Sequence, residues 1–195
     1  MNLEGKNIGF CFTGSFCMFA NTLRELEKLS KIKDINIIPI MSYNSYNFDT
    51  KFGTAFSFIN KVEEITKNKI IHSIQDAEPI GPKKMFDILI VAPCSGNTIA
   101  KLANDIIDTP ACMAVKSHLR NSSPVVLGIS TNNALSGAAE NIGKLLNRKN
   151  YYFVPVRQDN PITKPTSLVF DTTYIKRTLE EALDGIQIQP FLLGL

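Results

Sequence analysis

Several common signatures of ligand chemistry are missing from this sequence. Its four cysteines include no Cys-x-x-Cys pair and have no histidine at zinc-site spacing, so we predict no metal site. The turn after the first apolar run lacks the Gly-x-Gly-x-x-Gly dinucleotide fingerprint, and no Gly-x-x-x-x-Gly-Lys-Ser/Thr motif of an ATP-binding loop occurs. These absences count against zinc enzymes, nicotinamide dehydrogenases and P-loop nucleotide hydrolases.

The sequence also lacks a strong excess of positive or negative charge, and it lacks long apolar runs. The chain has 21 lysines and arginines against 18 aspartates and glutamates, a net charge of +3 that is too small and too scattered for nucleic-acid binding. No apolar run approaches the roughly 20 residues that cross a bilayer, and residues 1–6 lack the pattern of a signal peptide. We therefore expect a cytoplasmic protein with free thiols and with no nucleic-acid or membrane partner.

What the sequence does contain is an alternation of short apolar runs with longer segments of helical period. A length of 195 residues with 44% hydrophobic content predicts one domain over residues 1–195. The alternation predicts a doubly wound α/β fold, Rossmann-like or flavodoxin-like, with a parallel sheet of about six strands and helices on both faces. Residues 88–92 are apolar at every position, so this strand is expected to be central.

The expected elements follow from the apolar spacing and from the helix-start and turn residues. Strands are expected over 7–12, 35–40, 69–74, 86–92, 125–130 and 151–156. Helices are expected over 16–32, 54–66, 98–107, 110–120, 136–148 and 173–183, and loops over 41–53, 76–84 and 157–170.

Two short loops follow the first and fourth predicted strands. Thr13, Gly14 and Ser15 follow the first, and the Pro-Cys-Ser-Gly-Asn-Thr loop at 93–98 follows the fourth. These strands are neighbours in a doubly wound sheet, so the loops are expected to face each other at its carboxyl edge. Glycines, hydroxyls and the unpaired N–H groups of a helix start favour a phosphate there. The alternative is that the hydroxyls are plain helix caps.

A mononucleotide, FMN, is the cofactor that this pattern favours. The end of the second predicted strand, Ile40-Met41-Ser42, lacks the acidic residue that binds a nicotinamide ribose. Ser42 is a further candidate contact or part of a solvated loop, and 130–132 suits a flavin ring edge or starts a helix. The candidate cofactor-binding residues are Gly14, Ser15, Phe16, Ser42, Ser95, Gly96, Asn97, Thr98, Ser130, Thr131 and Asn132.

At these loops the sequence resembles the flavoprotein family of homo-oligomeric flavin-containing cysteine decarboxylases. That family has a Gly-Ser turn after strand one and a Pro-Ala-Ser-Ala-Asn-Thr loop after strand four, where this chain has Pro-Cys-Ser-Gly-Asn-Thr. The resemblance implies bound FMN and a homo-oligomer. The family's Pro-x-Met-Asn-x-x-Met segment is replaced by Ser-Thr-Asn-Asn-Ala-Leu-Ser at 130–136, which argues against decarboxylation of a cysteine and for another substrate.

Longer segments resemble the dipicolinate synthase branch of this family: 77–83, 93–104, 108–110, 113–121, 130–135 and 152–159. The resemblance implies a role in sporulation, in the mother cell of a spore-forming bacterium. There a pair of different subunits oxidises a dihydrodipicolinate-type intermediate to dipicolinic acid. The partner, the A subunit of the synthase, resembles a nicotinamide-dependent dehydrogenase and would carry NADP. The flavin would then be an electron acceptor, a structural relic or absent.

A small dicarboxylate substrate needs fixed cations, for which the sequence offers Lys83, Lys116 and Arg120. Lys116 and Arg120 are four residues apart, hence on one helix face, and a guanidinium can grip both oxygens of a carboxylate. The alternative is a solvated helix face.

No catalytic residue is assigned by the sequence. His72 and His118 lie inside a predicted strand and a predicted helix, and Cys17 and Cys94 are expected to pack. Three functions stay open: an oxidoreductase subunit with FMN, a non-catalytic partner that stabilises the dehydrogenase-like subunit, and a flavin-dependent decarboxylase or prenyltransferase.

Overall fold

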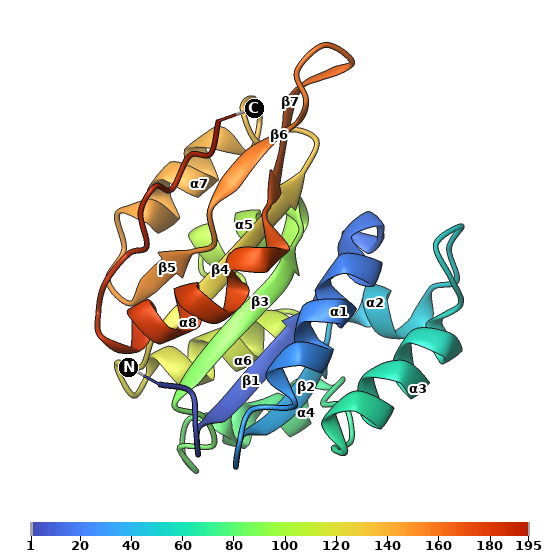
Figure 1. Cartoon of the computed structure of the whole chain (residues 1–195), viewed down its shortest axis with the longest axis vertical. Coiled ribbons are helices and arrows are strands. Elements are labelled where there is room, and N and C mark those ends of the chain that lie inside the picture. The colour runs from blue at the N-terminus through green and yellow to red at the C-terminus, as the bar shows by residue number, and fades with distance from the viewer. Residues whose placement is uncertain (1, 195) are drawn as a thin grey trace.

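A seven-stranded sheet forms the centre of the computed structural model, which describes residues 2–194 (Figure 1). The strand order is β2-β1-β3-β4-β7-β6, with β5 also paired to β4. The pairs among β1 to β5 are parallel, whereas β7 runs antiparallel to β4 and β6. The strands are β1 (Asn7–Phe12), β2 (Asn36–Met41), β3 (Ile88–Cys94), β4 (Val125–Thr131), β5 (Tyr151–Phe153), β6 (Val156–Asn160) and β7 (Lys164–Phe170).

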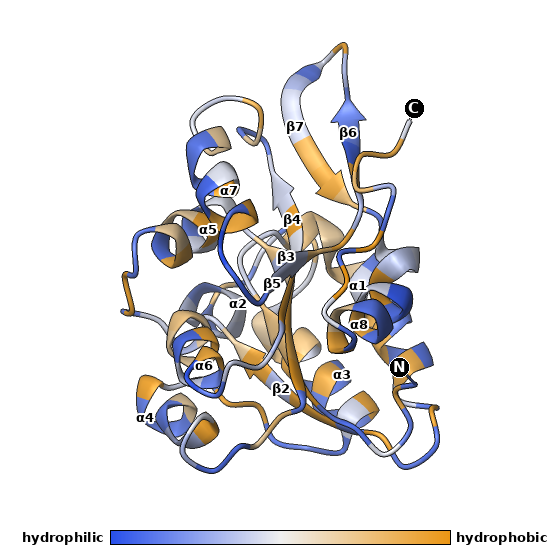
Figure 2. Cartoon of the chain, turned by 90° about the vertical axis from the view of Figure 1, so that its left-hand side faces the viewer, coloured by the Kyte–Doolittle hydropathy of each residue, from blue (hydrophilic) through white to orange (hydrophobic). Residues whose placement is uncertain are grey.

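Helices cover both faces of the sheet, which Figure 2 shows edge-on between them. One layer holds α1 and α8 with α3, and the other holds α4, α5, α6 and α7. This arrangement confirms the predicted α/β class. The helices are α1 (Phe19–Leu29), α2 (Tyr43–Asn47), α3 (Ala55–Thr66), α4 (Ile74–Ala77), α5 (Gly96–Ala103), α6 (Pro110–Leu119), α7 (Ala139–Leu146) and α8 (Ile175–Leu183).

Apolar spacing explains how these layers pack. In α1 the buried residues are Phe19, Thr22, Leu26 and Leu29, at the three- and four-residue intervals that place side chains on one helix face. All seven residues of β3 are buried, as its unbroken apolar sequence predicts for a strand covered on both faces. Among residues 2–194, no helix combines the length and the apolar character that a membrane span requires.

The strand expected over 69–74 is wrong. Only Ile71 pairs with the outer edge of β2: its N–H donates to Pro39 O and its carbonyl accepts from Met41 N, both at 2.9 Å. Pro39 has no N–H to offer to that edge, so the ladder cannot extend. The following residues start α4 instead, because the Ser73 hydroxyl accepts the N–H of Asp76 at 3.0 Å.

The loop expected over 157–170 is also wrong, because most of it forms the β6–β7 hairpin that projects beyond the body of the molecule in Figure 1. The two prolines that predicted a loop lie at the turn and near the start of β7. The Asn160 side chain closes the turn by accepting N–H bonds from Ile162 and Thr163. β5 pairs with the first half of β4, and β7 with its last two residues, Ser130 and Thr131.

Two further loops contain short helical segments. Within 41–53, Ser42 accepts the N–H of Ser45 and thereby begins α2. Within 76–84, α4 continues into a 3-10 turn at Glu78–Ile80. The backbone then passes so close to α6 that a Cβ on Gly81 would lie 2.1 Å from the carbonyl oxygen of Ser117, so only glycine fits there.

Candidate functional site

The loops after β1 and β3 are joined by hydrogen bonds at the carboxyl edge of the sheet. Thr13 follows β1 and is fully buried, and its hydroxyl donates to Pro93 O at 2.8 Å. The Thr13 hydroxyl oxygen also accepts the N–H of Ser95 at 2.9 Å, and the Thr13 N–H donates to Pro93 O. The predicted adjacency of these two loops is therefore confirmed.

The loop after β4 joins the same edge. The Ser15 hydroxyl donates to the carbonyl oxygen of Ser130 at 2.7 Å, which links the loop after β1 to the end of β4. The hydroxyl of Thr131 donates to Asn133 Oδ1 at 2.7 Å. Three loops thus present hydroxyl and amide groups around one point, and the hydrogen bonds between them fix their relative positions.

Helix α5 begins at this point. Ser95 is its N-cap, with a hydroxyl that accepts the N–H of Thr98 at 3.4 Å and lies 3.2 Å from Thr98 Oγ1. Gly96 and Asn97, at the first two helical positions, have N–H groups without an intrahelical acceptor. These groups, with the positive end of the helix dipole, can bind an anion.

Gly96 allows the loops to approach closely. A Cβ at this position would lie 2.6 Å from Thr131 Oγ1 and 3.2 Å from Asn133 Oδ1. The glycine therefore accounts for one departure from the Pro-Ala-Ser-Ala-Asn-Thr loop, because in this chain the threonine of β4 occupies the space that an alanine methyl group would need.

Two adjoining cavities open around the start of α5, and we call them together the crevice. The larger is about 570 Å³ and the smaller about 350 Å³, and Gly14 and Ser95 line both. All the cofactor-binding residues predicted from the sequence line one or the other, although their role in binding stays a prediction. Gly14, Ser15, Phe16, Ser95, Gly96, Ser130, Thr131 and Asn132 line the larger cavity, and Ser42, Asn97 and Thr98 line the smaller one.

The sequence-based prediction missed two lysines of the larger cavity, Lys51 and Lys164. Lys51 lies in the segment between α2 and α3, and Lys164 begins β7. Both segments were expected to be loops, so nothing in the pattern placed either lysine beside the 93–98 loop. No carboxylate lines the larger cavity within residues 2–194, so its lining suits an anionic group.

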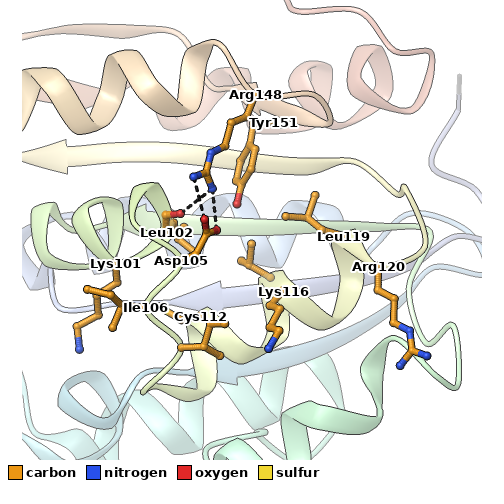
Figure 3. A pocket seen from close by; sticks show the side chains of 12 residues that line it. Lys101, Leu102, Asp105, Ile106, Cys112, Lys116, Leu119, Arg120, Arg148 and Tyr151 are labelled. Atoms are coloured by element: carbon orange, nitrogen blue, oxygen red, sulfur yellow. Dashed lines mark hydrogen bonds and ion pairs between the residues drawn. The ribbon is translucent and has the colours of Figure 1, made fainter.

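The predicted substrate cations lie elsewhere. Lys116 and Arg120 line a separate pocket of about 300 Å³ between α5 and α6, which we call the α6 pocket (Figure 3). Figure 3 shows the charged ends of both side chains pointing away from the Arg148–Asp105 ion pair across that pocket. Lys83 is exposed after the Glu78–Ile80 turn and lines neither the α6 pocket nor the crevice. Their role in substrate binding stays a prediction.

The α6 pocket is held together by paired charges. Arg148 donates to the carbonyl oxygens of Leu102 and Ala103, at 3.1 and 2.9 Å, where α5 ends. It also forms an ion pair with Asp105 at 2.9 Å, and this hydrogen-bonded partner raises the pKa of the guanidinium. Burial raises the pKa of the neighbouring Tyr151 to about 12, so its phenol is neutral at physiological pH.

Neither the buried thiol of Cys94 nor the buried ring of His118 is placed for catalysis. Cys94 ends β3, and burial raises the pKa of its thiol far above the ordinary value, so it is no thiolate nucleophile. Burial lowers the pKa of His118, whose Nε2 lies 3.1 Å from Pro124 O. His72 stacks on Tyr46 with ring centroids 3.9 Å apart. Cys17, by contrast, is exposed and lines the crevice.

Comparison with known proteins agrees with this geometry. The family model described as Flavoprotein matches residues 1–176, and the chain belongs to that family. Within it, the chain is similar to the dipicolinate synthase B subunit of Bacillus subtilis (strain 168), with 40% identity over 192 residues that cover 98% of this chain and 96% of the relative. The resemblance seen in the sequence motifs is thereby confirmed.

Solved structures show the same relation. The crystal structure of the dipicolinate synthase B subunit from Bacillus halodurans C has a TM-score of 0.90 and 43% identity, covering 100% of this chain and 99% of that one. Burkholderia xenovorans DmrB in complex with FMN, described as a cubic protein cage for redox transfer, has a TM-score of 0.67 and 15% identity over 93% of this chain and 97% of that chain. The latter likeness shows the shared fold.

Proposed function

We propose that this chain is the flavin-binding subunit of a two-component dipicolinate synthase. In this proposal it holds FMN in the crevice and takes part in oxidising a dihydrodipicolinate-type intermediate to dipicolinic acid. The observation that carries it is the convergence of three hydroxyl-rich loops on the start of α5, in a chain so similar to dipicolinate synthase B subunits.

The crevice fits FMN in charge and in size. The N–H groups of Gly96 and Asn97 suit a phosphate, as do the hydroxyls of Ser95 and Thr98. Among residues 2–194 no carboxylate lines the larger cavity, and Asp108, which lines the smaller one, is paired with Lys101 at 2.7 Å. The two cavities, about 570 and 350 Å³, lie within the usual range for small-molecule sites. When bound, FMN supplies a two-electron acceptor next to the substrate.

The chain's own residues then bind and position. The hydrogen bonds from Thr13 to Pro93 and from Ser15 to Ser130 hold the loops before any ligand arrives, so little conformational entropy is lost on binding. Cys94 and His118 do not transfer a proton to or from the substrate in this proposal, because both side chains are buried and neutral.

The proposed partner is the A subunit of the synthase, which would carry NADP and complete the site. We also propose a homo-oligomer, in the cytoplasm of the mother cell of a spore-forming bacterium. A non-catalytic role, in which this chain only stabilises that partner, is favoured because Asp108, the carboxylate that lines the crevice among residues 2–194, is held in an ion pair with Lys101 at 2.7 Å. Cysteine decarboxylation is disfavoured by the 130–136 segment, which lacks methionines.

A visible absorption spectrum of the purified protein, followed by FMN titration, tests the proposal. We expect flavin bands near those of free FMN and saturation at one FMN per chain. Mixing with a nicotinamide cofactor and the dehydrogenase-like partner should then produce dipicolinate only when FMN is present. Full-rate synthesis by the flavin-free pair would reject the redox role, and absence of FMN binding would reject the cofactor itself.

A further inference from the structure

A small turn between α2 and α3 presents two side chains to the crevice. Thr50 and Gly53 pair in an antiparallel bridge and exchange two backbone hydrogen bonds, of 3.0 and 3.1 Å, which leaves Lys51 and Phe52 at the tip. The Thr50 hydroxyl accepts the N–H of Phe52 at 3.1 Å. Gly53 has a φ of +147°, and a Cβ at this position would lie only 2.9 Å from the ring of Phe58, so the position requires glycine. The turn therefore has a defined shape fixed to α3.

Both tip residues line the larger cavity, together with Gly96 at the start of α5. The Phe52 side chain is 50% exposed, so a large apolar ring faces the opening rather than the core. The ammonium of Lys51 lies 5.3 Å from the centroid of that ring. An aromatic face and a cation thus stand side by side at the entrance.

Charge pairing separates Lys51 from the other lysine of this cavity. Lys164 forms an ion pair with Asp159 at 2.5 Å, which raises the pKa of the ammonium and balances its charge with that of the carboxylate. Lys51 has no carboxylate partner among residues 2–194, and its attraction to the Phe52 ring is weak at an exposed site. An anion that enters the crevice therefore meets one cation that is free to bind it.

We propose that Lys51 and Phe52 select the substrate of the crevice, with Lys51 binding a carboxylate of a planar ring and Phe52 packing on the face of that ring. The inference rests on the proposed function, because the remainder of the crevice must hold the flavin. It differs from the assignment of Lys83, Lys116 and Arg120, which lie outside the crevice. The chemical class it names is a flat, carboxylate-bearing heterocycle.

The test is calorimetric titration of the full-length, FMN-loaded protein with two dicarboxylates, planar pyridine-2,6-dicarboxylate and flexible heptanedioate. Lys51→Gln should weaken both by about tenfold, the loss of one charge-assisted bond. Phe52→Leu should weaken only the planar ligand, by about fivefold. The matched control is Lys61→Gln, which removes an exposed lysine of α3 that lines neither cavity of the crevice and should change either affinity less than about twofold.

Several outcomes would overturn the inference. Unchanged dicarboxylate binding by Lys51→Gln, together with its loss in Lys116→Gln/Arg120→Gln, would move the substrate to the α6 pocket. A Lys51→Gln protein that loses affinity for FMN but not for riboflavin would show that Lys51 serves the phosphate. Wild-type protein that binds no FMN rejects the proposed function as well, whereas FMN binding with indifference to Lys51 rejects this inference alone.

Discussion

The crevice and the α6 pocket lie at opposite ends of α5 and differ in whether the polar groups of the helix end are already paired. At the start of the helix, hydroxyls and unpaired N–H groups surround the crevice, whose larger cavity no carboxylate of residues 2–194 lines and whose smaller cavity is lined by Asp108 in an ion pair with Lys101. At its end, Arg148 already fills the role of a ligand by binding the last carbonyl groups and Asp105. The difference teaches that a helix end stays available to a ligand only when the fold leaves its polar groups unpaired.

The variant with the largest expected effect on this comparison adds a methyl group at the start of α5, inside the crevice. Gly96→Ala would place a methyl group 2.6 Å from Thr131 Oγ1, so the loop must shift. We expect a cost of about 2 kcal/mol, seen as a roughly thirtyfold weaker FMN affinity in fluorescence-quenching titration. Gly96→Ala/Thr131→Ala, which removes the clashing oxygen, should recover most of the affinity. If the double variant binds no better than the single one, the contact with Thr131 is not what Gly96 protects.

The next largest effect should come from the opposite end. Arg148→Met keeps the side-chain stem but removes the guanidinium donors to the carbonyl groups of Leu102 and Ala103. We expect the free energy of unfolding to fall by about 1.5 kcal/mol in urea denaturation, since the pair is partly exposed. FMN affinity should not change. A large loss of FMN affinity at equal stability would contradict the division between a binding end and a structural end.

A helix cap inside the crevice can be compared with one outside it. Ser95→Ala and Ser73→Ala each remove an N-cap hydroxyl, from α5 and from α4, and each should lower the free energy of unfolding by about 1 kcal/mol. Only Ser95→Ala should also weaken FMN binding, by a few-fold. Equal effects of the two variants on FMN affinity would show that Ser95 acts as a cap and nothing more.

The smallest expected effect is a pH dependence that comes from His118, a buried residue of α6. Burial lowers the pKa of His118 below that of an unfolded histidine, so the unfolded chain binds the proton more readily. Stability is therefore present above about pH 6.5 and is lost as the pH falls through the folded pKa. Comparing unfolding at pH 7.5 and 5.0, His118→Gln should reduce the difference by at most about 1 kcal/mol. An unchanged difference would assign the acid sensitivity to other groups.

The sequence predicted best the parts that depend on local apolar pattern. The runs of β1, β3 and β4 are buried strands, and the loops after them meet because parallel neighbours end at one edge. The choice of crevice residues needed only this rule. The error in the third predicted strand, over 69–74, therefore did not affect the choice of crevice residues.

What the sequence could not predict were the cations, because their position depends on distant segments. Lys116 and Arg120 do share a face of α6, yet that face borders the end of α5 rather than its start. Lys51 and Lys164 stand on a turn and a hairpin that were expected to be featureless loops. Proline and polar residues predicted irregular chain there, whereas long-range pairing with β4 and packing on α3 gave each segment a fixed place.

The attachment of the β6–β7 hairpin has a mechanical consequence. It pairs with β4 only through Ser130 and Thr131, which also line the crevice, and it holds Asn132 through the Thr166 hydroxyl at 2.7 Å. A movement of the β6–β7 hairpin, whose tip residue Ile162 is 90% exposed, would therefore also move the wall of the crevice. By reciprocity, a protein that binds the hairpin and a ligand that fills the crevice change each other's affinity when both favour the same or opposite positions of that wall.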